Sequence, residues 1–168
     1  DTKGLVVFLG TFSKILVPGY RLGWVCASDE ILSMFNFIKQ GADLQTPTVT
    51  QLEANKYMEM FDLDKHVDTI RELYKHRRDV MMKTMEETFP KEAKLTHPDR
   101  RLFTWVELPE YIDTRKMALQ CLEKKVAYVP GGSFFPNGGH ENCFRMNYSC
   151  MPDDKIVEGV KAIAEVIK

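Results

Sequence analysis

The 168-residue sequence predicts a mixed fold, α/β at its start and α+β in the remainder. The first sixty residues hold short apolar runs that are typical of strands from a larger sheet. After residue 62 the pattern predicts a long helix, a strand, a helix, two strands and a helix, the order of a small sheet covered by helices. We therefore expect residues 1–55 to be the tail of a large domain and residues 56–168 to form a small C-terminal domain.

Two strands and a turn are expected near the start of the chain. The apolar run from Leu5 to Leu9 ends at Gly10 and is typical of a fully buried, parallel strand. Proline and glycine at 18–19 predict a turn, and the alternating apolar side chains of "RLGWVCAS" predict a second strand. Asp29 is expected to cap the helix that follows, and Thr48 or Thr50 to cap the next one.

A long amphipathic helix is expected from Leu63 to Phe89, because apolar side chains recur there at three- and four-residue spacing and Pro90 follows. The later elements are shorter. They are a strand in "RLFTWVELP" with Leu102, Thr104, Val106 and Leu108 on one side, a helix from Thr114 to Lys124 capped by Thr114, strands in "VAYVP" and "CFRMNYS", and a last helix opened by Pro152.

Composition narrows the class of protein. With 44% apolar residues and a net charge of −1, the chain has enough apolar residues for a core but no broad basic field for nucleic acid or anionic lipid. The four cysteines form no CxxC pair and the four histidines show no ligand spacing, so we expect reduced cysteines and no metal site. We also expect a cytoplasmic protein without a membrane contact, and a sequence that begins at a cut end.

Lys14 lies in the otherwise apolar stretch "GTFSKILVPGYRLGW", with Thr11, Ser13 and Arg21 close by. A lysine at a strand end is most often a solvated surface residue. Here, however, two hydroxyls and an arginine suit a phosphate dianion, and the P-loop pattern that would explain a nucleotide phosphate is absent. A dry site would favour the neutral amine, which attacks carbonyls. The group fits a cofactor that carries both a phosphate and an aldehyde.

"TFSKILVPGYRLGWV" closely resembles the active-lysine segment of the fold-type I pyridoxal-phosphate aminotransferases, class I/II. The resemblance implies that Lys14 carries the cofactor aldimine and that Thr11, Ser13 and Arg21 hold the cofactor phosphate. It also implies that residues 1–55 are the end of the large pyridoxal 5'-phosphate-binding domain of such a protein.

A second motif, "VAYVPGGSFFPNGGHENCFRMNYS", resembles the segment of this family that ends in an arginine-bearing strand. The resemblance implies that Arg145 binds the substrate α-carboxylate, whereas the residue alone would suggest a surface salt bridge at a strand edge. Within the family, the chain looks most like the branch of aminoadipate and kynurenine aminotransferases and MocR-type regulators.

The resemblance implies an aminotransferase that moves an amino group between an amino acid and a 2-oxo acid. It further implies a homodimer in the full-length protein and an inactive C-terminal fragment in the present chain, with no nucleic acid bound by it. Two alternatives remain open: a pyridoxal-phosphate-binding effector domain of a MocR-type transcription regulator, and a lyase or synthase that shares the motif.

Overall fold

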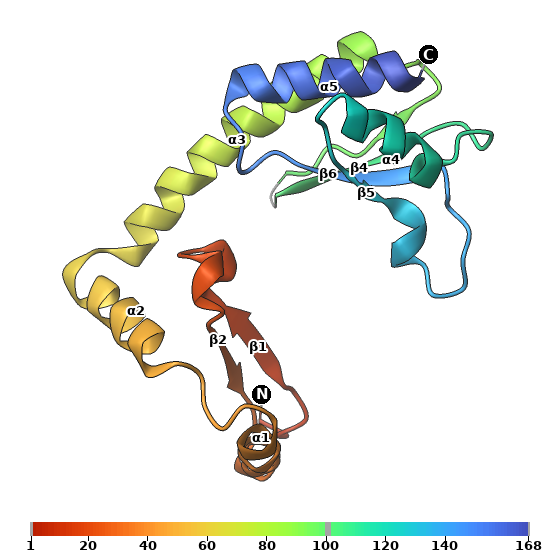
Figure 1. Ribbon diagram of the computed structural model, residues 1–168. Helices are drawn as coiled ribbons and strands as arrows, with labels where there is room; N and C mark the ends of the chain where they lie inside the picture. Colours follow the sequence, from red (N-terminus) through yellow and green to blue (C-terminus); the bar gives the residue numbers. More distant parts are fainter. Residues whose placement is uncertain (1, 100–101, 168) are drawn as a thin grey trace. The chain divides into compact units, whose positions relative to one another are not determined.

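The computed structural model describes residues 2–99 and 102–167 and divides into two compact units, Asp1–Thr69 and Ile70–Lys168 (Figure 1). The division falls within the helix α3 (Leu63–Thr88), the long helix that the sequence predicted. The expected mixed class is therefore observed. The domain boundary at residue 55 stays a prediction, and the two units are described separately below.

The first unit contains a two-stranded antiparallel sheet and two helices. Its elements are β1 (Phe8–Thr11), the 3-10 helices η1 (Phe12–Lys14) and η2 (Pro18–Tyr20), β2 (Gly23–Cys26), α1 (Asp29–Ala42) and α2 (Thr48–Met60). The expectation of a buried parallel strand over residues 5–9 is wrong for this chain. The strand starts at Phe8, runs antiparallel to β2, and leaves the Leu5 side chain 80% exposed. The turn at 18–19 reverses the chain and thereby sets the antiparallel direction.

The Trp24 side chain packs closely against Gly10 and Phe12 and holds the end of β1. Gly10 pairs with Trp24, and a Cβ on Gly10 would lie 2.0 Å from the indole, so only glycine leaves room for it. The indole also packs against Phe12, with 4.9 Å between ring centroids. This contact holds the point at which β1 passes into η1.

The second unit is a four-stranded antiparallel sheet with three helices. The strands are hydrogen-bonded in the order β3 (Lys94–Leu95), β4 (Phe103–Glu107), β6 (Cys143–Asn147) and β5 (Val129–Pro130). Along the chain, α4 (Thr114–Glu123) comes between β4 and β5, η3 (Gly131–Phe134) between β5 and β6, and α5 (Asp153–Ile167) after β6. The sequence did not predict β3. Arg101, the first residue of the predicted "RLFTWVELP" strand, lies outside the described residues.

All three predicted helix caps differ from the structure. For α2 the cap position is Pro47, Thr48 is the first helical residue, and no side chain caps the helix. The cap of α4 is Asp113, whose Oδ1 accepts hydrogen bonds from the backbone N–H groups of Arg115 and Lys116 at 3.0 and 3.1 Å; Thr114 is the first helical residue. Likewise α1 is preceded by Ser28, and Asp29 is its first residue. An acidic residue in the first turn still suits the positive end of the helix dipole.

The core of the second unit lies on one face of its sheet, where α3, α4 and α5 cover it (Figure 1). Alternate side chains of β4 and β6 point into this core: Thr104 and Val106 from β4, and Phe144 and Met146 from β6. Because side chains alternate along a strand, Phe103, Trp105 and Arg145 lie on the opposite face. Arg145, the arginine of the second predicted motif, therefore lies on the sheet face away from the core.

Candidate active site

The Thr11 hydroxyl joins the two strands of the first unit at the start of η1. Its Oγ1 accepts a hydrogen bond from the backbone N–H of Ser13 at 3.1 Å and donates one to the Leu22 carbonyl at 3.1 Å. Thr11 is therefore the N-cap of η1, a role that serine and threonine side chains favour. The arrangement fixes the short helix that carries Ser13 and Lys14.

Arg21 returns to the same short helix from the other side of the turn. It ends η2 in a left-handed conformation, with φ of 52°. Its Nη1 donates to the Ser13 hydroxyl at 3.3 Å and to the Pro18 carbonyl at 3.1 Å. The structure thus brings together Thr11, Ser13, Lys14 and Arg21, the four residues of the predicted cofactor site.

These side chains suit a phosphate group. Arg21 forms no ion pair with a carboxylate in the part of the chain that the structure describes, and it is exposed, so its guanidinium can bind an anion. The Ser13 hydroxyl lies within hydrogen-bond distance of it and can donate to a further oxygen. The Thr11 hydroxyl donates its hydrogen to the Leu22 carbonyl. Thr11 therefore holds the loop and also adds a polar oxygen to the site.

Lys14 is exposed in the described chain, and the dry, neutral amine expected for the complete site stays a prediction. The apolar neighbours Ile15, Leu16 and Val17 are half-buried and do not enclose the amine. The apolar neighbours of Lys14 in the sequence therefore do not by themselves bury its side chain.

Arg145 lies in the middle of β6, paired with Trp105 on one side and Val129 on the other. It is therefore on an inner strand, and none of the ion pairs among described residues includes it. The alternative of a salt bridge at a strand edge is not supported. The guanidinium carbon instead lies 4.2 Å from the ring centroid of Phe103 and 4.6 Å from that of Phe134.

A surface hollow of about 790 Å³ includes this arginine. Its lining residues are Thr96, Pro98, Asp99, Phe103, Thr104, Trp105 and Arg145. Aromatic and polar side chains line it together, which is usual for sites that bind small molecules. The second unit thus supplies a surface hollow whose described lining includes the guanidinium of Arg145.

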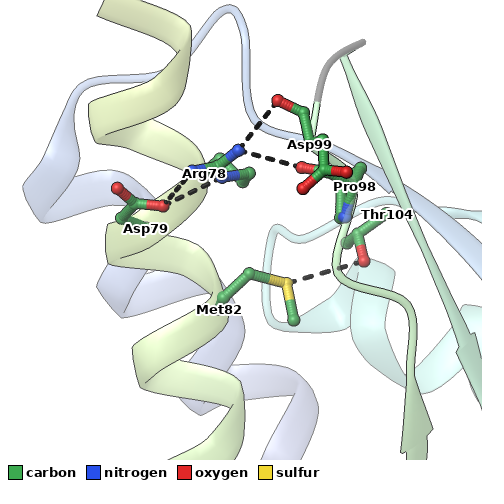
Figure 2. A network of polar contacts seen from close by, with 6 residues as sticks. All are labelled: Arg78, Asp79, Met82, Pro98, Asp99 and Thr104. Atoms are coloured by element: carbon green, nitrogen blue, oxygen red, sulfur yellow. Dashed lines mark hydrogen bonds and ion pairs between the residues drawn. The ribbon is translucent and has the colours of Figure 1, made fainter.

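One side of this hollow is held by α3 (Figure 2). Arg78 Nη1 donates to the backbone carbonyls of Pro98 and Asp99 at 2.9 and 3.1 Å, while its Nε and Nη2 donate to Asp79 at 2.9 and 2.7 Å. One turn further along, the Met82 sulfur accepts a hydrogen bond from Thr104 at 3.6 Å. These contacts fix the segment that leads into β4.

The sequence analysis missed Phe103 and Phe134 as neighbours of Arg145. One signal for Phe103 was available, since it lies two residues before Trp105 and must share its face of the strand. The register that places it diagonally across from Arg145 is visible only in the structure, where Phe103 pairs with Asn147.

The fold is that of aminotransferases. Over 99% of this chain, the structure of kynurenine aminotransferase from Pyrococcus horikoshii superposes with a TM-score of 0.91 at 42% identity. LysN, the α-aminoadipate aminotransferase from Thermus thermophilus, gives a TM-score of 0.93 at 34% identity over 96% of this chain. Each superposition covers 41% of the other protein's chain.

Residues 1–163 match the aminotransferase class I and II family, and the chain belongs to that family. Along its whole length it is 46% identical to aromatic-amino-acid aminotransferase 1 from Thermococcus litoralis and covers 40% of that relative. The chain thus spans about two fifths of the length of such relatives. A transcriptional regulator, YjiR from Escherichia coli, matches at a lower 28% identity over 99% of this chain and 35% of the regulator, so the regulator alternative is not favoured.

Proposed function

We propose that this chain is the C-terminal part of a pyridoxal 5'-phosphate-dependent aminotransferase that transfers an amino group between an amino acid and a 2-oxo acid. The observation that carries the proposal is the short helix η1, in which Lys14 directly follows Ser13, whose hydroxyl accepts a hydrogen bond from Arg21. The chemistry of these side chains and membership of the class I and II family both support the proposal. The named relatives act on different amino acids, so the proposal specifies only the class of substrate.

In this proposal Ser13 and Arg21 hold the cofactor phosphate, and Thr11 keeps the loop in place and adds a hydroxyl oxygen. Pyridoxal phosphate supplies an aldehyde and an electron-withdrawing ring when it is bound. Lys14 Nζ would accept the proton from the substrate Cα as a general base and then donate it to the cofactor C4′ as a general acid. Arg145 binds the α-carboxylate in a planar pair of hydrogen bonds and so orients the Cα–H bond.

The decisive experiment labels Lys14 in the full-length protein. After borohydride reduction of the cofactor-loaded protein, mass spectrometry should find the cofactor attached to the peptide that contains Lys14. Lys14→Ala should lose both the attachment and transamination, while Lys39→Ala should keep both, because Lys39 is on α1 and pairs with Asp43. Attachment at another lysine, or transamination at an unchanged rate in Lys14→Ala, would refute the proposal.

We further propose that the 168-residue chain alone binds the cofactor weakly and is inactive, since Lys14 is exposed in it. Titration with pyridoxal phosphate should give no tight, stoichiometric complex. We also propose a cytoplasmic homodimer for the full-length protein, which sedimentation velocity can test. Among the described residues, no helix is long and apolar enough to cross a bilayer.

A further inference from the structure

Arg145 is held differently from the other arginines whose contacts are described. Arg21, Arg77 and Arg78 all donate hydrogen bonds to protein oxygens. Arg145 instead lies against two phenylalanine rings, and its Nε is buried without a hydrogen-bond partner. Since buried polar atoms are usually paired, an arginine held in this way needs an explanation.

The two rings come from different parts of the second unit. Phe103 is on β4, two residues from Trp105, which pairs directly with Arg145. Phe134 ends η3, and η3 is pressed against β6: a Cβ on Gly131 would lie 2.6 Å from the Cβ of Cys143. The strand register and this close approach both hold the rings in place, and both ring centroids are within the cation–π range of about 6 Å.

We propose that Phe103 and Phe134 are positioning residues for Arg145, which fix the plane of its guanidinium for binding the substrate carboxylate. A ring face attracts the cation without accepting its directed N–H groups, whereas a protein carboxylate would occupy the donor fork that the substrate needs. No described carboxylate pairs with Arg145, in agreement with this role. The inference rests on the proposed function, because it assigns Arg145 to the carboxylate.

The test compares Phe103→Leu and Phe134→Leu in the full-length protein. Leucine keeps an apolar side chain but removes the ring face. The carboxylate is bound in both the ground state and the transition state, so KM for the amino acid and the 2-oxo acid should rise while kcat changes little. We expect a rise of about 3- to 30-fold, the range that cation–π contacts support.

The controls separate positioning from a general loss of structure. Phe103→Tyr keeps the ring and should restore KM. Phe135→Leu is the matched control. The Phe135 ring stacks on His140 with 3.9 Å between centroids and meets Trp105 edge-on at 6.1 Å, but it is neither of the two rings described over Arg145, so KM should stay unchanged. If Phe103→Leu behaves like Phe135→Leu, or if tyrosine does not restore KM, the inference is wrong.

A measurement without turnover uses the full-length protein without substrate. Both rings should shift the Arg145 Nε proton upfield in the NMR spectrum, and Phe103→Leu should remove much of that shift; an unchanged resonance would contradict the inference. Arg145→Gln distinguishes the proposed positioning role of the phenylalanines from the proposed carboxylate site. A large rise of KM in Arg145→Gln with none in the phenylalanine variants overturns only the positioning role, whereas no rise in Arg145→Gln overturns the proposed carboxylate site itself.

Discussion

Thr114 offers a test of how the segment before β6 is held. Its side chain is fully buried, and its hydroxyl lies 2.8 Å from the Glu141 carbonyl and 2.7 Å from the Cys143 carbonyl. The backbone N–H of Thr114 also donates to Glu141 at 2.8 Å, so that carbonyl keeps a partner when the hydroxyl is removed. Thr114→Val should therefore affect chiefly the Cys143 carbonyl.

The expected loss follows from this geometry. Valine has nearly the shape of threonine, so the change opens no cavity but leaves a buried acceptor without its donor, which costs about 1–3 kcal/mol. Thr114→Ser keeps the hydroxyl and loses one methyl group, at a cost of about 0.8 kcal/mol. The valine variant should thus be the less stable of the two, although its side chain is the more apolar.

Urea unfolding followed by tryptophan fluorescence can measure these losses. The chain has two tryptophans, so a Trp24→Phe background leaves Trp105, on β4 of the same unit, as the only reporter. The unfolding midpoint should fall in both variants at an unchanged slope. A loss below about 0.5 kcal/mol for Thr114→Val, the range of neutral surface changes, would refute the reasoning.

Two further predictions concern backbone space and pH. Gly131→Ala should destabilise the chain by about 1–3 kcal/mol, because the new Cβ would lie 2.7 Å from the Cys143 carbonyl oxygen. Gly159→Ala, in the middle of α5 with its nearest side-chain atoms at 3.8 Å, should stabilise it by about 0.5–1 kcal/mol; thermal unfolding of both variants checks the opposite signs. The backbone N–H of Lys116 lowers the pKa of Asp113 below its ordinary value of 3.8. The ionised Asp113 carboxylate therefore stabilises the folded chain fully above pH 3.8. This stabilisation is lost as the pH falls through the lower pKa of the folded state. Asp113→Asn keeps a capping oxygen without the charge, and its stability should depend less on pH below 3.8; equal slopes for the two proteins would contradict the assignment.

Local pattern predicted most elements of the second unit. The helix expected from Leu63 to Phe89 is observed from Leu63 to Thr88, because the three- and four-residue apolar spacing and Pro90 are both local signals. The alternation in β4 also identified its buried side, including Thr104 and Val106. Short β3 was missed, because two residues carry no measurable period.

Strand direction and burial in the first unit were not predictable in the same way. The apolar residues 5–9 indicate a segment that favours an apolar environment, but they do not encode which element covers it or in which direction the neighbouring strand runs. Lys14 shows the same limit. Its apolar neighbours do not encode which part of the protein covers the amine, and in this chain the side chain is exposed.

The sequence alone determined which side chains form the predicted phosphate site, because Thr11, Ser13, Lys14 and Arg21 lie within eleven residues. A tight turn brings such neighbours together without contacts from distant parts of the chain. Only the tertiary structure decided how Arg145 is held. Its two phenylalanines lie 42 and 11 residues before it, and they meet it through strand register and the packing of η3 against β6. Contacts of that kind depend on how separate elements pair, and no local pattern specifies the pairing.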